Sequence, residues 1–454
     1  MRTVLVTLFS AASALALLAA PAAAHAQGPD PTGEAAFRDL SLEEAISEAL
    51  AGNSDLAIAE ARRQISEKHS TAAGAPLWPQ VDLGAGYTRS TDPVFAFGTK
   101  LRQGRFGSAD LAIDALNDPD AVGDWSTRIG VRWSLLDPTV WAARASAKKG
   151  AEAAELSALR AREATILMTR ILYYRALMTA ADQASAAAAR AAAQATLDAF
   201  RQRRDRGLLT EADLLQAEAE LAAAEAALTQ AERMRTDALQ DLGRHLGWSP
   251  DTLPQPTDTL TSPAPIEGRE FDPRQRADVK ARRAAAAAAG RARTRALLGW
   301  VPALDAFAEY TTHSTDAFAF DEDHWTVGLA LRWTVFSGFA RTAGIQRASL
   351  ERHIAEIEYE RALRDARAEL QQAERAVRAA LDGVEATRAA ADAAATGRDL
   401  MRRRFEEGLA TAADLLQAEA RATEMRERAI SALANYHVAV ANLEFVRSQV
   451  NQES

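Results

Sequence analysis

The chain carries one structural plan twice, and this duplication limits its possible folds more than any other feature. Residues 207–220 read GLLTEADLLQAEAE, and residues 408–421 read GLATAADLLQAEAR. The two stretches keep the same register at an offset of 201 positions. A fixed internal period is the sequence signature of architectures assembled from repeated supersecondary units. We therefore expect two copies of one unit within this chain.

The repetition extends well beyond these fourteen residues. The segment WSTRIGVRW at 125–133 is echoed by WTVGLALRW at 325–333, with Trp125, Arg132 and Trp133 matched at an offset of 200. Residues 79–88 are echoed in the same way by residues 302–311. Each copy therefore predicts the same order of elements: a helix, a β-hairpin, a long helix, a tight turn and a second helix.

The expected boundaries follow from this alignment. The first copy covers residues 40–247, with its hairpin at about 80–136 and its turn at 207–210; the second covers 273–450, with its hairpin at about 302–336 and its turn at 408–411. Residues 248–272, which lie between the copies, are rich in proline. Proline cannot continue a helix or a central strand, so this composition predicts a linker.

The hairpin arms alternate between apolar and polar residues. In the second arm of copy one, one face holds Thr127, Ile129, Val131, Trp133 and Leu135, and the other holds Ser126, Arg128, Gly130, Arg132 and Ser134. An arm of about ten residues with period 2 is typical of a transmembrane β-strand with one lipid face and one wet face. A half-buried sheet of a soluble protein alternates too, so the pattern alone leaves both structures open. Aromatic residues near the strand ends favour the membrane.

Long alanine-, arginine- and glutamate-rich helices fill the rest of the chain. Residues 138–206 contain no interior proline and predict a helix on the order of 100 Å long, and residues 340–407 predict a matching one. The flanking helices are expected to be about half as long, at about 41–72, 210–246, 273–298 and 411–449. Because such helices are not stable alone, they must pack along an apolar seam, such as Leu214, Leu221 and Leu228.

The repeated stretch itself predicts a sharp reversal between two antiparallel helices. Gly207 and Gly408 each follow a run of arginines, as expected for a glycine that ends a helix, with Leu208 and Leu409 next to pack back on that helix. Thr210 with Asp213, and Thr411 with Asp414, have the spacing of a capping box that begins the next helix. The two copies predict two such tips side by side.

The N-terminus predicts export from the cytoplasm. Residues 1–26 have one positive charge, a short apolar run and an Ala-His-Ala ending, as in a cleaved signal peptide. No later segment predicts an apolar spanning helix. The chain has no cysteine, which excludes disulfides, thiol nucleophiles and cysteine-ligated metals. Its net charge of −9 argues against nucleic acid as a partner.

Counting strands predicts an assembly. Two hairpins supply four strands, whereas membrane barrels begin at about eight. Open sheet edges are not tolerated in lipid, because their backbone groups would have no hydrogen-bond partner. Two or more chains must therefore share one barrel, if the hairpins enter a membrane at all.

With these residues located, the chain resembles the TolC-like outer-membrane efflux family over nearly all of its mature length. Residues 42–50 (LEEAISEAL) with Asn53 resemble the first-helix signature, and Pro79–Tyr87 and Arg332–Gly338 resemble strand motifs of the family. Residues 276–281 (RADVKA) resemble the start of the second half, although Ala277 stands where proline is more usual. The two Gly-Leu…Asp-Leu-Leu tips resemble the periplasmic helix turns.

The resemblance implies a mainly α-helical protein with a β-barrel part. Three chains would form one twelve-stranded barrel in the outer membrane of a Gram-negative bacterium, in contact with outer-membrane lipid and continued by a periplasmic α-barrel. It implies a passive channel without a cofactor, which is served by an inner-membrane transporter and a periplasmic adaptor protein. The adaptor would meet the tips at Gly207, Leu208, Leu209, Thr210, Gly408, Leu409, Ala410 and Thr411.

The resemblance also implies a gate at the periplasmic entrance, where aspartates line the second-copy tip. Asp414 matches one such position, and Gln417 stands where some relatives carry a second aspartate. Three copies of Asp414 around an axis would favour cations and raise one another's pKa. The alternative is that Asp414 only caps its helix, as Asp213 does in copy one.

No catalytic or metal-binding set emerges from the sequence, so we expect no enzyme. His313 and His324 flank a hairpin loop that is rich in acidic residues, where we expect solvated polarity rather than a metal site. In the longer loop after Thr88, Phe95, Phe97 and Phe106 would restrict the outer mouth or pack on its rim. Drug or metal efflux, type I protein secretion and a non-channel periplasmic coiled-coil scaffold remain competing functions.

Overall fold

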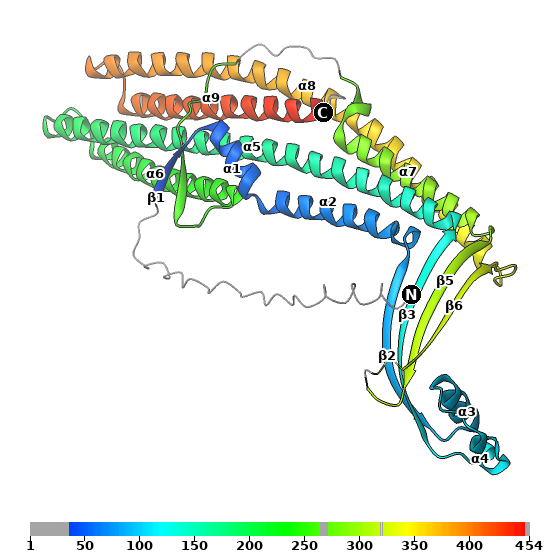
Figure 1. The fold of residues 1–454 in the computed structure, drawn as a ribbon. Coiled ribbons are helices and arrows are strands. Elements are labelled where there is room, and N and C mark those ends of the chain that lie inside the picture. The colour runs from blue at the N-terminus through cyan, green and yellow to red at the C-terminus, as the bar shows by residue number, and fades with distance from the viewer. Residues whose placement is uncertain (1–35, 264–270, 318, 320, 450–454) are drawn as a thin grey trace.

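The computed structural model describes residues 36–263, 271–317, 319 and 321–449, so the expected signal peptide at 1–26 lies outside the described residues. A bundle of long helices leads at one end into a four-stranded sheet (Figure 1). The prediction of a mainly helical protein is confirmed.

Two long helical hairpins form the bundle. The first joins α5 (Pro138–Asp205) to α6 (Glu211–Leu246), and the second joins α8 (Ala340–Glu406) to α9 (Ala412–Arg447). Two shorter helices, α2 (Ser54–Ala73) and α7 (Ala277–Leu298), pack along the sheet-proximal parts of α5 and α8. The helices thus lie in the order α6, α5, α9, α8 toward the tips and α2, α5, α7, α8 toward the sheet.

The prediction of a single helix at 41–72 is wrong, because the helix is interrupted at Asn53, which separates α1 (Leu42–Gly52) from α2. The Asn53 side chain accepts the N–H of Leu56 at 3.0 Å, which makes it the N-cap of α2. Its amide group donates to the carbonyl of His245 at 2.8 Å. An asparagine that caps one helix and binds another element is favoured over helix continuation, since both of its polar ends are satisfied.

The expected linker contains a strand. Strand β4 (Thr252–Pro256) pairs in parallel with β1 (Ala36–Leu40) beside the helices. The Tyr173 hydroxyl lies 2.9 Å from the Leu40 carbonyl and 2.6 Å from the Asp258 carboxylate, so it ties both ends of this region to α5. The core here consists of Leu40, Ala45, Ala49, Leu172, Tyr173, Ala176, Leu177, Leu239, Leu242, Leu246 and Leu253.

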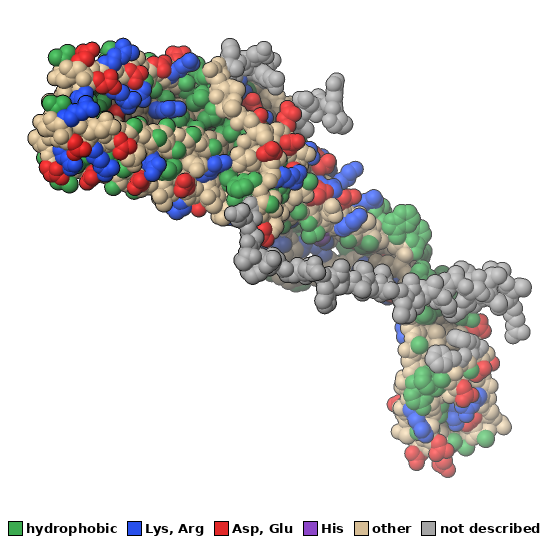
Figure 2. All heavy atoms as spheres, turned by 90° about the vertical axis from the view of Figure 1, so that its left-hand side faces the viewer, with side chains coloured by type: hydrophobic (Ala, Val, Ile, Leu, Met, Phe, Trp, Pro, Cys, Tyr) green, Lys and Arg blue, Asp and Glu red, His purple; other side chains and the backbone are tan. Residues whose placement is uncertain are grey.

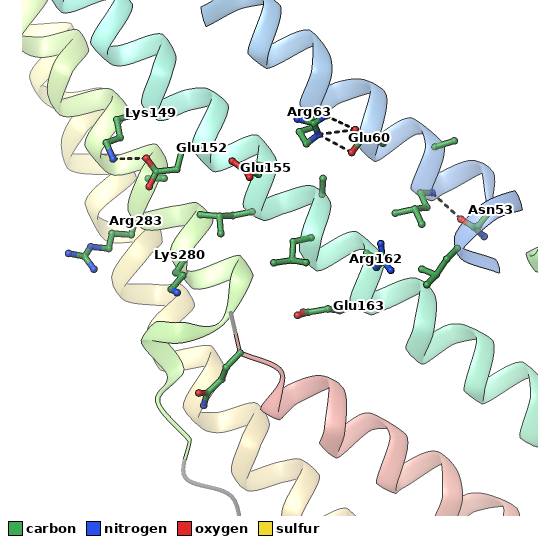
Figure 3. Close-up of a pocket in the computed structure, with 18 of the residues that line it drawn as sticks. Asn53, Glu60, Arg63, Lys149, Glu152, Glu155, Arg162, Glu163, Lys280 and Arg283 are labelled. Carbon is green, nitrogen blue, oxygen red and sulfur yellow. Dashed lines mark hydrogen bonds and ion pairs between the residues drawn. The ribbon is translucent and has the colours of Figure 1, made fainter. Parts of the chain in front are cut away.

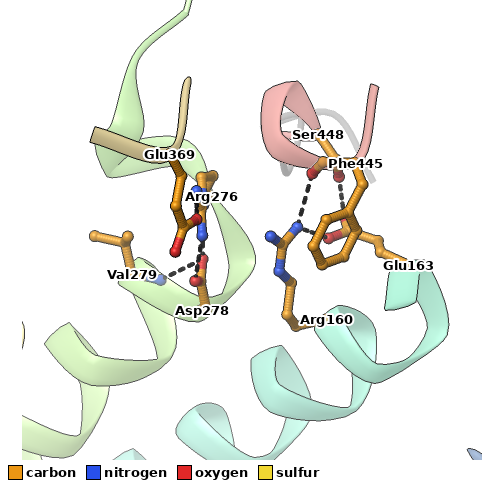
Figure 4. Close-up of polar contacts among 8 residues, drawn as sticks. All are labelled: Arg160, Glu163, Arg276, Asp278, Val279, Glu369, Phe445 and Ser448. Atoms are coloured by element: carbon orange, nitrogen blue, oxygen red, sulfur yellow. Dashed lines mark hydrogen bonds and ion pairs between the residues drawn. The ribbon is translucent and has the colours of Figure 1, made fainter. Parts of the chain in front are cut away.

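The second half of the chain begins at a buried arginine (Figure 4). After a short 3-10 turn at Pro273–Gln275, Arg276 is only 2% exposed and binds Asp278 at 2.6 Å and Glu369 at 2.7 Å. Nearby, the Arg160 guanidinium lies 3.5 Å from the Phe445 ring centre and donates to the Phe445 carbonyl at 2.9 Å. These contacts join α7 to α8 and the end of α9 to α5.

The sheet is antiparallel throughout, in the order β2-β3-β5-β6. Its strands are β2 (Gln80–Ser90), β3 (Val122–Leu136), β5 (Ala303–Ser314) and β6 (Glu322–Arg332). The two hairpins therefore lie side by side through β3 and β5, and β2 and β6 are open edges in the single chain.

The long loop between β2 and β3 is not merely a loop. It contains α3 (Pro93–Arg102), a 3-10 turn (Ser108–Leu111) and α4 (Ile113–Asn117). These elements lie at the end of the sheet that is remote from the helices (Figure 1). We call residues 91–121 the insertion.

Candidate functional sites on the sheet and at the helical tips

One face of the sheet is apolar and exposed. The register aligns Leu83 with Ile129 and Ala308 with Val327, so the alternation predicted for each strand combines into one continuous face. Leu83 is 71% exposed, and Leu329 is 68% exposed. Exposed apolar area of this kind is unfavourable in water, and it marks an interaction or membrane surface.

The opposite face is charged. Arg128 lies 3.9 Å from Glu309, Arg132 lies 3.6 Å from Asp82, and Arg332 lies 2.9 Å from Asp305. These pairs join neighbouring strands across the ladder, where opposite charges favour the observed register. The sheet therefore has one face suited to lipid and one suited to water.

Aromatic residues stand at both ends of the apolar face. Tyr87 packs against Trp125 with a ring separation of 4.8 Å, and Tyr310 is aligned with Trp325. At the other end, the indole N–H of Trp133 donates to the Leu77 carbonyl at 3.0 Å, and that of Trp333 donates to the Trp300 carbonyl at 3.1 Å. The eight-residue spacing within each Trp pair corresponds to about 27 Å along a strand, or roughly 21 Å of height for a strand tilted by about 40°, which fits within a membrane-embedded apolar band about 25 Å tall.

The two helical tips have the same backbone geometry. Gly207 and Gly408 adopt left-handed φ values of 71° and 77°. The N–H of Leu208 donates to the Arg203 carbonyl at 2.9 Å, and the N–H of Gly207 donates to the Arg204 carbonyl at 2.7 Å. This pair of bonds is the Schellman motif that ends a helix at glycine, and the bonds of Leu409 and Gly408 repeat it in the second copy.

A capping box opens the following helix at each tip. The Asp414 carboxylate accepts the Thr411 N–H at 3.0 Å and the Thr411 hydroxyl at 2.6 Å, while the Thr411 hydroxyl oxygen accepts the Asp414 N–H at 3.2 Å. Thr210 and Asp213 make the same contacts. The hydrogen bonds from Thr411, with a smaller contribution from Arg404, hold the pKa of Asp414 below its usual value in the single chain. Its carboxylate is therefore ionised at neutral pH.

The leucines after the tip glycines do not pack back as expected, which corrects the sequence-based prediction. Leu208 is 68% exposed and Leu409 is 64% exposed. The space between the helices is already filled by aromatic and leucine side chains, and the next residues, Leu209 and Ala410, contact that cluster instead. Each tip therefore presents one unpartnered leucine in the single chain.

The two tips lie side by side through a small core. Its buried members are Leu197, Phe200, Leu214, Ala217, Phe405, Ala412, Leu415 and Leu416. The Arg203 guanidinium lies 4.2 Å from the Phe405 ring centre and donates to the carbonyls of Phe405 and Glu406 at 2.7 and 3.0 Å. Viewed from the tip side, the surface mixes charges of both signs with apolar side chains (Figure 2).

Asp414 and Gln417 both lie on the exposed side of α9, away from this core. The buried side of the same turn carries Glu419, which the sequence did not single out. Its carboxylate binds Arg402 at 2.8 Å and accepts the Thr196 hydroxyl at 3.2 Å. Glu419 thus links α9 to α8 and α5 just behind the tip.

A half-buried carboxyl lies farther along the same helices. Asp182 on α5 lines a groove between α5, α6 and α9 together with Glu424 and Glu427. Burial, with the negative charge of Glu427, raises the pKa of Asp182 to about 6. Nothing in its sequence context distinguishes Asp182, because its burial depends on two helices that are distant in sequence.

This shift predicts a pH-dependent stability. The folded state holds the Asp182 proton more tightly than the unfolded state, whose pKa is about 3.9, so stability falls as pH rises from about 4 to about 6. Replacing Asp182 by Asn is expected to raise the unfolding free energy by roughly 1 kcal/mol near neutral pH, after allowance for solvent screening. At about pH 4, thermal unfolding should show no gain in stability for Asp182→Asn over the unmodified protein. Asp198→Asn, at an exposed site on the same helix, is the control, and an equal gain at both pH values for Asp182→Asn would contradict the prediction.

A groove with a volume of about 1310 Å³ lies between α2, α5 and α7 (Figure 3). Arg63 pairs with Glu60 at 2.7 Å, and Lys149 pairs with Glu152 at 2.5 Å. Its described lining holds carboxylates and cationic side chains but no histidine, serine or threonine. This groove is a surface of mixed charge.

The histidines near the short hairpin loop differ from expectation. His313 is not a solvated loop residue, because it is buried within β5 and its Nδ1 lies 2.8 Å from the Asp124 carboxylate. His324 lies on β6, with its ring centre 5.7 Å from that of His313. Among the described residues, no group of three or more potential ligands could hold a metal ion.

The helices carry no membrane-spanning signal: within the described part of the chain, none is both long and apolar enough to cross a bilayer.

A two-faced antiparallel sheet that continues into long helical hairpins defines the class of TolC-like outer-membrane channels. The sequence profile described as outer membrane efflux protein matches residues 45–248 and 274–446. The chain belongs to this family, whose members are channels rather than enzymes.

Solved structures of similar proteins share the fold. The outer membrane protein VceC of Vibrio cholerae is 22% identical, with a TM-score of 0.76 over 90% of this chain and 96% of that one. The CmeC outer membrane channel of Campylobacter jejuni is 15% identical, with a TM-score of 0.75 over 89% and 85%. The MtrE outer membrane channel of Neisseria gonorrhoeae is 20% identical, with a TM-score of 0.73 over 89% and 88%. No curated protein matches the chain by sequence.

Proposed function

We propose that this chain is one subunit of a homotrimeric outer-membrane channel, which conducts substrates delivered by an inner-membrane transporter through a periplasmic adaptor. The observation that carries this proposal is the sheet. Its apolar face is exposed between two aromatic ends, its other face is charged, and both of its edges are open. A closed barrel satisfies all three features at once, since closure pairs the edges, turns the charged face inward and leaves the apolar face to lipid.

Three copies are the number that the family resemblance implies, and the surfaces of the single chain support lateral assembly. Helix α8 exposes Leu350 and Ile354 at 64% and 56%, and α2 exposes Ile58 and Ile65 at 48% and 67%. These residues recur at helical spacing on the two outer helices of the sheet-proximal layer. We infer that α8 of one protomer packs against α2 of the next, on the same sides as the pairing of β6 with β2.

The adaptor is assigned to the tips at Gly207–Thr210 and Gly408–Thr411. Leu208 and Leu409 support this assignment, because each is an exposed leucine on a backbone fixed by two caps.

We propose that the channel serves the efflux of small compounds or metal ions, and type I protein secretion is the alternative function. Purified protein in a planar bilayer tests the channel itself: stepwise conductance by a detergent-extracted trimer supports it, and a freely soluble protein without conductance contradicts it.

The entrance gate is assigned to Asp414, with Gln417 one turn farther along α9. Replacing Asp414 by Asn removes the charge yet keeps a side-chain oxygen to accept the Thr411 N–H, so the helix cap survives. We expect Asp414→Asn to lower the preference for cations over anions severalfold in bilayer recordings, because three charges leave the entrance. Asp213→Asn makes the same change at the first tip and should leave selectivity unchanged. Unchanged selectivity in Asp414→Asn, as in Asp213→Asn, would leave Asp414 only the role of a helix cap.

A further inference from the structure

The insertion at residues 91–121 is a folded unit at the outer end of the sheet (Figure 1). Asp92 caps α3 by accepting the Phe95 N–H at 2.7 Å. Lys100 binds Asp110 at 2.7 Å, and the rings of Phe97 and Phe106 meet edge to face with their centres 4.8 Å apart. These contacts hold α3 against the segment that follows it, so the insertion has a defined shape.

A buried polar cluster fastens the insertion to the sheet. Gln103, which is 6% exposed, donates from Nε2 to the Gly123 carbonyl at 2.9 Å, the Asp124 carboxylate at 3.0 Å and the Ser314 carbonyl at 3.2 Å. The Asp124 carboxylate in turn contacts His313. We call Gln103, Asp124, His313 and Ser314 the Gln103 latch. Since these groups are buried together, unfastening the insertion would leave several of them unsatisfied.

The insertion is fastened over the charged face. Asp124 continues the alternation of Arg128 and Arg132 along β3, and His313 is aligned with Ser126 on the same face. On β6, which carries the same alternation, His324 Nε2 lies 3.1 Å from the carbonyl oxygen of Arg102. In a closed barrel this face is the inner wall, so α3 lies over the pore rather than outside it.

The insertion also carries apolar side chains without a partner in the single chain. Val94 is 80% exposed, Leu101 50%, Leu111 62% and Ile113 75%. Lipid is not their partner, because the insertion is fastened to the face opposite the apolar one. The remaining apolar surface within reach is the same insertion on the other protomers.

The diameter of a twelve-stranded barrel and the width of three helices agree with a meeting of the three insertions on the barrel axis. Twelve strands spaced about 4.8 Å apart and tilted by about 40° form a ring of roughly 24 Å in diameter between opposite strand backbones, and inward side chains make the open mouth narrower than this. Three helices, each about 10–12 Å wide with side chains, occupy a circle of roughly 22–26 Å when packed around one axis. We propose that residues 91–121 of the three protomers close the outer mouth of the channel, held inward by the Gln103 latch and packed together through these apolar side chains. This inference rests on the proposed trimeric channel.

The test uses the full-length chain with one reporter cysteine. The natural sequence has no cysteine, and Gly130 lies in the middle of the charged face with no atom within 4 Å of an added Cβ. Gly130→Cys in intact cells would be labelled from outside by a bulky, membrane-impermeant maleimide. Replacing residues 91–121 by Asn-Gly leaves a two-residue turn between the paired residues Ser90 and Val122. We expect this replacement to speed labelling at least tenfold, and Gln103→Ala to speed it severalfold.

Thr315→Ala, in the exposed loop beside the insertion, is the control and should leave labelling slow. Unchanged labelling in the replacement and in Gln103→Ala, with trimers present, would overturn the closure while leaving the channel intact. Absence of detergent-extracted trimers from the unmodified chain would instead overturn the proposed function, and the closure with it. If the replacement fails to assemble, Gln103→Ala decides alone, since it removes only one side chain.

Discussion

Leu409→Asp is expected to abolish export while trimers still form. Leu409 is 64% exposed and lies outside the tip core, so the fold does not depend on its side chain. Burying a leucine on a partner contributes about 1.5–3 kcal/mol, which corresponds to roughly a 10- to 150-fold change in binding. A charge at the same place adds a desolvation cost. Drug susceptibility of cells, together with trimer bands from detergent extracts, measures both parts of the prediction.

The first tip provides the comparison. Leu208 occupies the matching position and is 68% exposed, so Leu208→Asp should also weaken docking. Leu409→Met keeps an apolar side chain and should retain export. The contrast with Leu409→Asp would show that docking needs the apolar contact and not the exact shape of leucine. Normal export in both aspartate variants would show that the tips are not part of the adaptor-docking surface. Loss of trimers in either one would show instead that these leucines hold the assembly.

The tips show how far local chemistry alone can predict structure. The Schellman motif and the capping box each depend on residues within a few positions of one another, so Gly408, Thr411 and Asp414 suffice to place the reversal. The exposure of Leu409 does not follow from these residues. It depends on Phe200 and Phe405, which come from two copies that are 205 positions apart and fill the space first.

Long-range partners explain the other differences as well. The sequence placed Asn53 in the first-helix signature but did not predict a helix break there, because the acceptor for its amide comes from His245, which is distant in sequence. The proline-rich segment contains a strand because β1 lies beside it. The outer loop contains helices, and its Gln103 becomes a latch only when β3 and β5 bring Asp124 and Ser314 together. Periodicity predicted the long helices and the strands, since it is a property of each segment alone.

Two neighbouring residues of β6 discriminate most sharply between a membrane barrel and a soluble sheet. Leu329 lies on the apolar face, midway between Trp325 and Trp333, whereas Ala330 lies on the charged face opposite Asp305. An arginine at the bilayer midplane costs about 2–4 kcal/mol, or roughly 6–12 kcal/mol for three protomers. Leu329→Arg should therefore reduce membrane-assembled trimers by well over tenfold, as measured by outer-membrane fractionation and unheated gel electrophoresis.

Ala330→Arg makes nearly the same chemical change one residue later and should assemble normally, because its guanidinium enters the watery side beside the Asp305 carboxylate. A soluble half-buried sheet predicts no such difference: its apolar face would meet protein instead of lipid, so neither variant would change the membrane content of the protein. Equal assembly of the two variants would contradict the barrel, however well the helices match the family. The opposite effects of adjacent residues follow from the two-residue period of the strand, which is also what first distinguished these hairpins in the sequence.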